Sequence, residues 1–419
     1  MKVAHLLRKY DPAEWGGTET AVLRLLSGLR QHGIGAAVHA PRLAAEPLQD
    51  PLRDAGFAVR RYDAVVPVWG IPDEVRRQMV AVGGNLVSFE LLSALWREPG
   101  LSVVHSHALG RLGGIGLTVA RRRKLPFVVT IHGGCYDLPA SVSRDMNPPR
   151  AQGIEWGKVV GWAVRSRQML DEADVIFTCN PREAEKIRER HPRQRVRVQP
   201  HGVDAARYQQ DHRAAARLAF PWLEGARTLL VLGRLDTVKN PGWVVERMTE
   251  MLARDPQAEL VLAGACTEQA YGEGLKRRVR ELGLEDRVRI TGGLPAGDPR
   301  LIGLIQSARA MVLPSVSETF GLVILEAWAA GTPILASRTS GAMALIESGV
   351  NGVLFDLTRP LAFVEAAQKA MHDESWRAPV IAAGRRKVEA EYDTTVIAGQ
   401  VKQVYEELIA ERHPLRHTA

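Results

Sequence analysis

The sequence predicts an α/β protein of two doubly wound domains, each built on a parallel sheet. Three observations lead to this class. Short apolar runs typical of buried strands alternate with segments of helical periodicity along nearly the whole chain, and such alternation builds parallel sheets. The alternation stops at an alanine- and arginine-rich connector that runs to residue 224, and then restarts. A chain of 419 residues also exceeds one ordinary core, because domains span roughly 100–200 residues.

The N-terminal half contains the first set of strands and helices. Its opening strand leads to a loop with Gly16 and Gly17, and the apolar residues that follow recur at helical spacing. His132 lies at the carboxyl end of another buried strand, before a proline-rich loop over residues 135–150. We expect strands over residues 2–7, 36–40, 101–105, 127–131, 174–179 and 196–199. We expect helices over residues 18–33, 74–96 and 182–191, and a long helix that ends near residue 171.

The C-terminal half repeats the pattern. It ends in two helices, over residues 376–390 and 394–412, with Tyr392 between them. We place the domain boundary so that the first domain covers residues 1–203 and the second covers residues 204–392. The strands that we expect in the second domain cover residues 228–232, 259–263, 288–291, 310–314, 333–336 and 352–355.

The most informative stretch is residues 317–326, between a buried strand and a helix. Glu318 lies in the loop before the helix, and Glu326 lies within its first turns. Backbone N–H groups near Phe320, Gly321 and Leu322 have no partner inside the helix, and such a helix start favours an anion. Two carboxylates on either side of a phosphate-sized site match the layout of a nucleotide sugar. The plainer alternative makes Glu318 an N-cap-like acid and Glu326 a solvated helix residue.

Other strand ends provide further polar groups, each with a plain alternative. Arg234 and Lys239 follow a strand and precede a helix start. The guanidinium of an arginine makes forked contacts with phosphate and the ammonium of a lysine acts as a point charge, so the pair would suit a diphosphate. They could equally be solvated loop cations. Gly16 and Gly17 let backbone approach an anion closely, although a glycine pair is usually only a turn. His132 is either a ligand contact at a strand's carboxyl end or a satisfied structural histidine.

The composition is that of a water-soluble globular protein, with 46% hydrophobic and 24% charged residues. Apolar runs stay below the ~18 residues that span a bilayer, and the chain opens directly with a strand. We therefore expect a cytoplasmic protein without a signal peptide or an anchoring helix. The three cysteines, Cys135, Cys179 and Cys266, fit no metal spacing, so we expect buried free thiols. The net charge of +8 favours anionic partners.

Several short motifs occur in one order along nearly the whole chain, and together they are specific. The most specific is the pair of glutamates with seven residues between them in Pro314-Ser-Val-Ser-Glu-Thr-Phe-Gly-Leu-Val-Ile-Leu-Glu-Ala327. With it the chain resembles the retaining glycosyltransferases of family 4, which have the GT-B fold. The other motifs are Gly16-Gly17-Thr-Glu, His132-Gly, Pro200-His-Gly-Val-Asp204 and Gly233-Arg234-Leu-x3-Lys239.

The resemblance implies a role for each matching position of the second domain. Glu326 resembles the residue that binds the ribose hydroxyls, and Glu318 resembles the one that holds the donor sugar's hydroxyls. Arg234 and Lys239 resemble the pair that neutralises the diphosphate leaving group. The base would pack against the loop over residues 291–294. The other donor-binding residues implied by the resemblance are Gly292, Leu294, Thr319, Phe320, Gly321 and Leu322.

In the first domain, the resemblance assigns the N-terminal loop and one histidine. Gly16 and Gly17 would let the loop close on the diphosphate and the acceptor, and His132 would touch the donor sugar near the reacting carbon. A last helix, over about residues 393–419, would complete the first domain, and the two sheets would face a central cleft. One departure is Gly264-Ala265-Cys266, where family members often have a second glycine, so that loop is left out of the donor site.

The reaction that the resemblance implies moves a hexose-type sugar from a nucleotide diphosphate sugar to a hydroxyl acceptor in polysaccharide or glycolipid synthesis. A UDP-sugar is the first choice of donor and a GDP-sugar the second. The family retains anomeric configuration. We expect no metal or other cofactor, because the sequence has no Asp-x-Asp motif or ligand cluster and fixed cations can stabilise the leaving group. Two alternatives stay open: a nucleotide-sugar epimerase of the same fold, and a non-catalytic protein that binds sugar nucleotides. A nucleic-acid partner is not expected, since no recognisable module is present.

Basic residues gather in the N-terminal half, as Arg60-Arg61, Arg76-Arg77 and the run over residues 121–124. One hypothesis is that they contact anionic lipid at the inner face of the plasma membrane while a lipid-linked acceptor is glycosylated. The alternative is that they are ordinary solvated helix faces.

Overall fold

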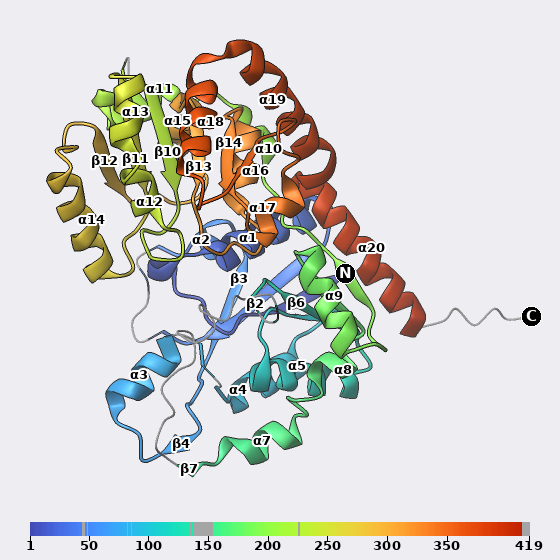
Figure 1. The fold of residues 1–419 in the computed structure, drawn as a ribbon. Helices are drawn as coiled ribbons and strands as arrows, with labels where there is room; N and C mark the ends of the chain where they lie inside the picture. The colour runs from blue at the N-terminus through green and yellow to red at the C-terminus, as the bar shows by residue number, and fades with distance from the viewer. Residues whose placement is uncertain are drawn as a thin grey trace, which may run out of the picture. The chain divides into compact units, whose positions relative to one another are not determined.

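The computed structural model describes residues 1–43, 47, 49–81, 83–84, 86–134, 136, 154–224 and 227–412. The chain divides into two compact units (Figure 1). The first comprises Met1–Pro200 together with Thr395–Ala419, and the second comprises His201–Thr394.

The first unit contains a seven-stranded parallel sheet with the strand order β3-β2-β1-β5-β6-β8-β9. Its strands are β1 (Lys2–Leu6), β2 (Gly35–Pro41), β3 (Ala58–Tyr62), β5 (Val103–Ser106), β6 (Phe127–Ile131), β8 (Val175–Thr178) and β9 (Val196–Val198). A separate antiparallel pair is formed by β4 (Val68–Trp69) and β7 (Ile154–Glu155). The helices are η1 (Pro12–Glu14), α1 (Gly17–Gln31), α2 (Pro51–Asp54), α3 (Asp73–Ala81), α4 (Phe89–Arg97), α5 (Gly110–Arg122), α7 (Gly157–Ala163), α8 (Met169–Glu172), α9 (Pro181–Arg190) and α20 (Thr394–Arg412).

Helix α20, at the end of the chain, completes the core of the first unit (Figure 1). Strand residues alternate between faces, so every second residue of β1, β5, β6 and β8 points to the same side of the sheet. On that side the strand residues pack with apolar residues of α20. The buried cluster consists of Val3, Leu29, Ile34, Val103, Val128, Val175, Phe177, Ala398, Val401, Val404, Tyr405 and Leu408. The first unit is therefore built from two separate stretches of chain.

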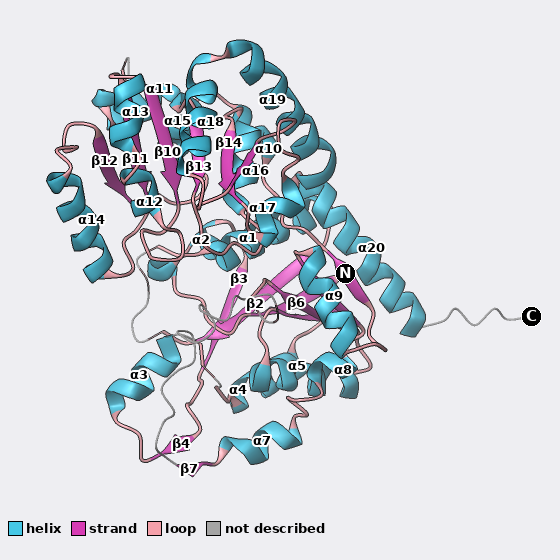
Figure 2. Ribbon diagram, viewed as in Figure 1, coloured by secondary structure: helices cyan, strands magenta, loops and turns pink. Residues whose placement is uncertain are grey.

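The second unit contains a six-stranded parallel sheet with helices on both faces (Figure 2). Its order is β12-β11-β10-β13-β14-β15, the order of a Rossmann sheet. The strands are β10 (Arg227–Leu232), β11 (Ala258–Ala263), β12 (Val288–Gly292), β13 (Ala310–Leu313), β14 (Ile334–Ser337) and β15 (Val353–Phe355). The helices are α10 (Ala205–Gln209), α11 (Arg213–Ala219), η2 (Pro221–Leu223), α12 (Pro241–Val245), α13 (Met248–Arg254), α14 (Gln269–Glu281), α15 (Pro299–Ser307), α16 (Leu322–Ala330), α17 (Ser340–Leu345), α18 (Pro360–His372), α19 (Glu374–Lys387) and the π-helix η3 (Val388–Tyr392).

Each sheet has one topological switch point, where the direction of winding reverses. It lies between β1 and β5 in the first unit and between β10 and β13 in the second. Ligands of open α/β sheets bind beyond the carboxyl ends of strands at such points. These two places are where the geometry of the candidate residues matters most.

Two predicted helices are wrong. The helix expected over residues 74–96 is two helices, α3 and α4, because Gly83 adopts a left-handed conformation (φ +65°) and Val87 pairs with Val65. The long helix expected to end near residue 171 is two short helices, α7 and α8, with Arg165 left-handed between them (φ +54°). The expected proline-rich loop lies outside the described residues, apart from Tyr136.

The prediction of buried thiols is confirmed for one cysteine and wrong for another. Cys179 is buried, but Cys266, in the segment between β11 and α14, is exposed. Cys135 lies outside the described residues. Among the helices described, none is long and apolar enough to cross a membrane.

Candidate active site

The two loops at the switch point of the second unit are joined by three contacts. The backbone N–H of Val316 donates to the carbonyl of Val238 (2.8 Å), and the Asn240 amide donates to the carbonyl of Pro314 (3.3 Å). The third contact is a salt bridge between the Lys239 ammonium and the Glu318 carboxylate. The structure therefore brings together one predicted cation and one predicted carboxylate, which lie 79 residues apart in the sequence.

The loop after β10 is shaped by Asp236, which the sequence analysis did not single out. This buried carboxylate accepts the backbone N–H of Lys239 (2.8 Å) and pairs with the guanidinium of Arg234 (3.0 Å). Arg234 itself is about half exposed. Both predicted phosphate-binding cations are thus neutralised by acids, Arg234 by Asp236 and Lys239 by Glu318.

The loop before α16 is held by backbone contacts from α17. Gly341 donates its N–H to the carbonyl of Glu318 (2.8 Å), and a Cβ at position 341 would lie 2.5 Å from the backbone nitrogen of Phe320. Gly321, the N-cap of α16, is left-handed (φ +92°), a conformation that favours glycine. Gly341 was missed because no local motif marks it: its role is a close approach between segments distant in sequence.

The plain alternatives for the two glutamates do not hold. Glu326 is the fifth residue of α16 and is only 5% exposed, so it is not a solvated helix residue. Glu318 does not cap the helix: the N-cap is Gly321, and the Glu318 side chain pairs with Lys239.

The predicted base-binding loop lies beside close-packed strand ends. Gly264 donates its N–H to the carbonyl of Gly292 (2.9 Å), and a Cβ at position 264 would lie 1.8 Å from the carbonyl oxygen of Gly233. Gly292 is left-handed (φ +77°), and Leu294 is half-buried. Gly264 therefore fixes the ends of three strands relative to one another, although its loop had been left out of the site.

A cavity of about 340 Å³ lies next to these strand ends, against α14. Its lining is mixed, with apolar strand-end residues on one side and polar helix residues on the other. The lining residues are Leu235, Cys266, Gln269, Gly272, Glu273, Leu275, Lys276 and Ile290.

Aromatic side chains pack around Phe320, in the loop before α16. The ring of Phe320, which is 5% exposed, meets the imidazole of His201 edge-on at 4.9 Å and lies 6.5 Å from the ring of Tyr392. Val203 accepts the N–H of Thr394 (3.0 Å) and donates to the carbonyl of Tyr392 (2.9 Å). The segment that begins with Pro200-His-Gly therefore connects the start of the second unit to its end, and His201 contacts the loop before α16.

In the first unit, His132 lies directly beyond β6. Gly133 and Gly134 follow it in left-handed conformations (φ +107° and +77°), which turn the chain away from the strand. The imidazole of His132 shares a hydrogen bond with that of His107 (Nε2 to Nδ1, 2.8 Å). Burial lowers the pKa of His132 to about 4, so the ring is neutral at physiological pH.

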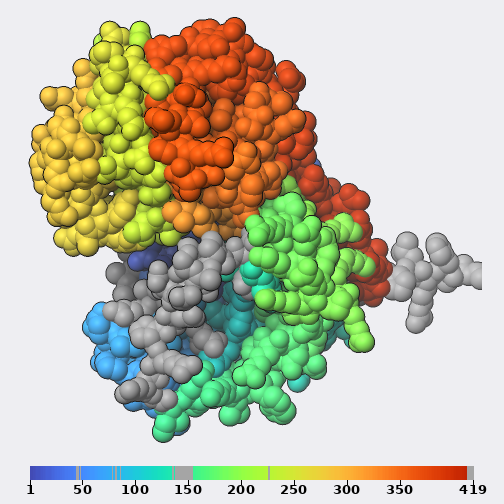
Figure 3. All heavy atoms as spheres, in the orientation of Figure 1, coloured from blue at the N-terminus to red at the C-terminus, as the bar shows by residue number. Residues whose placement is uncertain are grey.

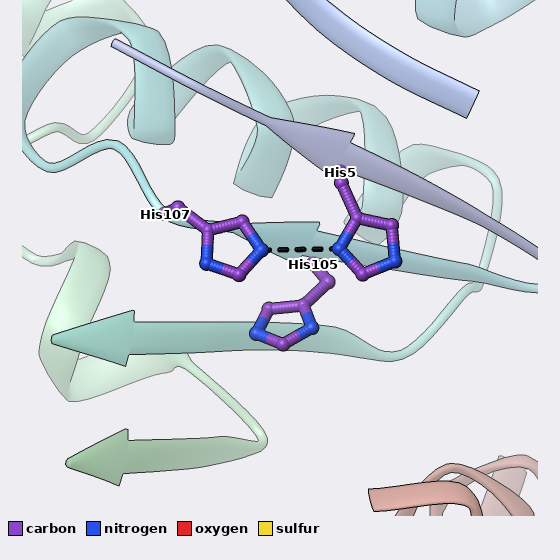
Figure 4. Close-up of side chains that lie close together, drawn as sticks. All are labelled: His5, His105 and His107. Atoms are coloured by element: carbon purple, nitrogen blue, oxygen red, sulfur yellow. Dashed lines mark hydrogen bonds between the residues drawn. The ribbon is translucent and has the colours of Figure 1, made fainter. Parts of the chain in front are cut away.

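Three further histidines gather near the switch point of the first unit, with ring nitrogens of His5, His105 and His107 all within 4.8 Å of one another (Figure 4). This could suggest a metal site, but five of the six ring nitrogens already have hydrogen-bond partners. His5 Nδ1 and His107 Nε2 share a hydrogen bond (3.0 Å), and both nitrogens of His105 are bonded, to Tyr405 (2.5 Å) and Thr130 (2.6 Å). The arrangement is a hydrogen-bonded network.

Gly16 and Gly17 lie at the start of α1. Gly16 is its N-cap, and its backbone N–H donates to the carboxylate of Glu19 (3.1 Å). Burial raises the pKa of Glu19. The loop from β1 to α1 therefore ends at a helix start whose first N–H group is satisfied by an acid from the same helix.

Two parallel Rossmann-like sheets, each in its own unit, define the class of fold: this is the GT-B fold, in which many glycosyltransferases are built. Solved structures of this class match nearly the whole chain. HepE of Anabaena in complex with UDP and glucose has a TM-score of 0.72 and 19% identity, covering 97% of this chain and 100% of that chain. Sucrose-phosphate synthase of Thermosynechococcus elongatus has a TM-score of 0.72 and 24% identity, covering 98% and 99%.

The chain belongs to the group 1 glycosyl transferases. Residues 214–387 match the family model "Glycosyl transferases group 1", and residues 16–202 match "Glycosyl transferase 4-like domain". Two relatives are the D-inositol 3-phosphate glycosyltransferases of Nocardia farcinica and Thermobispora bispora. The first is 30% identical over 81% of this chain and 73% of the relative, and the second is 28% identical over 95% and 91%.

Proposed function

We propose that this protein is a retaining glycosyltransferase that moves a hexose-type sugar from a nucleoside diphosphate sugar to a hydroxyl acceptor without a metal ion. The observation that carries the proposal is the Lys239–Glu318 pair where two loops meet at the switch point of a Rossmann sheet. A cation beside a carboxylate suits a donor with both phosphates and hydroxyls. UDP-sugars are the first candidates and GDP-sugars the second, since HepE of the same fold has been solved with UDP-glucose.

We assign the cations of the second unit to the diphosphate. Lys239 and Arg234 neutralise it, and in the structure they are paired with Glu318 and Asp236. Donor binding would then exchange partners, because the diphosphate takes the ammonium while Glu318 turns to the hydroxyls of the sugar. Such an exchange keeps each partly buried charge compensated before and after binding.

We assign the remaining contacts with the donor to residues in and next to α16 and to the loop after β12. We assign the carboxylate of Glu326, the fifth residue of α16, to the ribose hydroxyls. Backbone at the start of α16 faces the sugar and the phosphates. The other donor-binding residues that we propose are Gly292, Leu294, Thr319, Phe320, Gly321 and Leu322.

The first unit contributes to the transfer itself. We assign His132 to the transferred sugar near its reacting carbon, and Gly16 with Gly17 to a close backbone approach to diphosphate and acceptor. In the reaction the bond from the anomeric carbon to the diphosphate oxygen breaks, and the bond to the acceptor oxygen forms on the same face. The acceptor's proton passes to the departing phosphate oxygen, whose negative charge the fixed cations stabilise.

The test is a thermal-shift panel of UDP, GDP, ADP and TDP, each with and without magnesium. A ligand of the folded state must raise the melting temperature by mass action. We expect one nucleotide to stabilise the wild type independently of magnesium and not to stabilise Glu326→Ala. Glu365→Ala, which removes an exposed glutamate of α18, is the matched control and should respond like the wild type. Absence of stabilisation by every nucleotide would refute the donor site.

Turnover separates the proposal from its alternatives. Incubation of the stabilising nucleotide's sugars with acceptors should release the nucleoside diphosphate and give a product of unchanged anomeric configuration. The acceptor panel includes D-inositol 3-phosphate, after the relatives' names, beside monosaccharides and lipid-linked sugars. Interconversion of the donor sugar without an acceptor would instead indicate an epimerase, and binding without any turnover a non-catalytic protein.

For peripheral membrane contact, we now favour a different surface from the basic runs of the sequence. Arg61 and Arg76 donate to backbone carbonyls within the unit, and Arg60 pairs with Glu98. By contrast, large apolar side chains with exposed fractions of 63–81% occur on β4, β7 and α7. Residues 154–165, which include β7 and α7, lie along the lower edge of the first unit in Figure 3. These side chains, Trp69, Ile154, Val159 and Trp162, define an apolar patch.

Cations flank this apolar patch, since Lys158 and Arg167 are exposed on or near α7. Tryptophans beside cations are typical of proteins that rest on an anionic bilayer surface. We expect co-sedimentation with phosphatidylserine-containing vesicles at low salt, and a clear loss of it in Trp69→Ser/Trp162→Ser. Equal binding by wild type and double variant would remove this patch from the proposal.

A further inference from the structure

The loop over residues 8–16, which leads from β1 to α1, is anchored in the core of the first unit by Tyr10. The side chain of Tyr10 is only 1% exposed. Its hydroxyl donates to the buried carboxylate of Asp50, the N-cap of α2, and accepts the backbone N–H of Leu52 (3.3 Å). Burial, together with the bond to Asp50, raises the pKa of Tyr10, so the hydroxyl keeps the proton that it donates.

Arg61 of β3 holds Tyr10 at two further points. Its guanidinium lies over the Tyr10 ring, 4.7 Å from the centroid, and donates to the Tyr10 carbonyl (2.6 Å). The same guanidinium lies 3.7 Å from the carboxylate of Asp50, so the buried acid has a cation beside it. Tyr10 is therefore fixed at its hydroxyl, its ring and its backbone, by residues that lie 40 and 51 positions further along the chain.

Trp15 connects Tyr10 to the glycine pair. The two aromatic rings meet edge-on, with their centroids 6.2 Å apart. The indole N–H of Trp15 donates to the hydroxyl of Thr20 (2.8 Å), and that hydroxyl donates to the carbonyl of Gly16 (2.9 Å). These roles are unambiguous, because an indole nitrogen only donates and a hydroxyl has a single proton. A continuous path of contacts therefore runs from Asp50 to Gly16.

The segment between the two aromatic residues is a compact turn. Asp11 accepts the N–H of Ala13 at its side chain (2.9 Å) and the N–H of Glu14 at its carbonyl (3.0 Å). The side chains of Lys9 and Glu14 form an ion pair across this turn. Because the turn is short and internally bonded, a displacement of Tyr10 would also displace Trp15 and the residues that follow it.

We propose that Tyr10 and Trp15 are positioning residues, which hold Gly16 and Gly17 in the conformation that approaches the diphosphate of the donor. The approach to the diphosphate rests on the proposed function, whereas the anchoring of the loop is a property of the first unit alone. A loop that is correctly placed for only a fraction of the time weakens the apparent affinity for its ligand by that fraction. Weaker anchoring should therefore raise KM for the donor and leave kcat nearly unchanged.

The conformation of the loop is measured first, by hydrogen exchange and mass spectrometry on the full-length protein. Tyr10→Phe removes only the hydroxyl, and Trp15→Phe keeps a ring but removes the indole N–H. We expect a peptide over residues 8–17 to exchange about 3-fold faster or more in both variants, because local opening becomes more frequent.

Tyr62→Phe is the matched control. Tyr62 is also 1% exposed, and its hydroxyl donates to the carbonyl of Leu7 (3.2 Å). Leu7 is held by the sheet, since its own N–H donates to the carbonyl of His39 in β2 (2.9 Å). The control therefore loses a buried tyrosine hydroxyl without losing the anchor of the loop, and exchange over residues 8–17 should stay as in the wild type.

The second experiment compares steady-state kinetics with the nucleotide sugar that the wild type uses. We expect Tyr10→Phe and Trp15→Phe to raise KM for the donor about 5- to 20-fold and to leave kcat within about 2-fold. Thr20→Val, which removes the hydroxyl between Trp15 and Gly16, should act in the same way. Its combination with Tyr10→Phe should add little, because both changes act through one loop. A purely structural role would instead lower kcat through loss of folded protein and leave KM unchanged.

The positioning role would be overturned by unchanged exchange of the loop in both aromatic variants. Faster exchange with an unchanged KM for the donor would also overturn it, as would a loss of kcat that Tyr62→Phe shares. Failure of the proposed function has a different signature. The wild type then neither binds nor turns over a nucleotide sugar, while the loop still exchanges faster in Tyr10→Phe and Trp15→Phe than in the wild type.

Discussion

Lys239 and Glu318 illustrate how two charged residues of this site compensate each other. Their side chains are only 22% and 13% exposed, so each charge would be poorly solvated alone. Removing one partner should therefore leave the other uncompensated, whereas removing both should leave a nearly neutral gap. The pair differs in this from surface ion pairs, which contribute little.

We expect Lys239→Met to lower kcat/KM about 100-fold or more, because the diphosphate loses a fixed cation. The variant should also melt at a lower temperature than the wild type. Lys239→Met/Glu318→Gln should recover part of that stability but none of the activity. Lys402→Met, which breaks an exposed pair with Glu406 in α20, serves as the control and should change neither. Additive losses of stability in the double variant would show that the two side chains act independently.

The buried histidines predict an acid limit to stability. Burial lowers the pKa of His39 to about 4, although the Glu98 carboxylate opposes the shift. Between pH 7 and 5 the unfolded chain therefore binds a proton here that the native protein does not, so native stability falls as pH falls. His39→Phe should lose about 2 kcal/mol less than the wild type over this interval. Urea unfolding at both pH values measures the difference, and equal losses would contradict the neutral assignment.

At the scale of elements, the contact between α17 and the loop before α16 decides the shape of the donor site. We predict that Gly341→Ala weakens nucleotide binding, because its Cβ would meet the backbone of Phe320 at 2.5 Å and push the loop away. Gly274→Ala in α14 is the control, since its Cβ would meet only the tip of Arg277 at 3.9 Å. Titration of both variants with the stabilising nucleotide tests this, and equal affinities would show that the loop tolerates displacement.

Elements were predictable where the signal is local. The apolar runs that became β10 and β13, and the Gly331 stop of α16, follow from residue type and spacing alone. The single helix expected over residues 74–96 fails at Gly83 and Gly84, a break visible in the sequence but outweighed by the surrounding periodicity. Asp236 and Gly341 could not be singled out as functional, because their roles depend on contacts between loops.

At the scale of the whole molecule, the two units differ in how their chain is connected. The second unit is one continuous stretch, His201–Thr394, and contains every candidate donor residue except Gly16, Gly17 and His132. The first unit needs α20 from the far end of the chain, both for its apolar cluster and for the Tyr405 hydroxyl that bonds with His105. Nucleotide binding and transfer should therefore be separable by cutting the chain.

We predict that a fragment of residues 201–394 folds on its own and is stabilised by the same nucleotide as the full protein, yet transfers no sugar. It has a complete six-stranded sheet with its own core, and it retains Lys239, Glu318 and Glu326. Residues 1–200 alone should not unfold cooperatively, because the sheet face that α20 covers would be open to water. Calorimetry of both fragments tests the pair of expectations. A folded 201–394 fragment without any nucleotide response would mean that binding requires the first unit, and that Lys239, Glu318 and Glu326 are insufficient for the donor site.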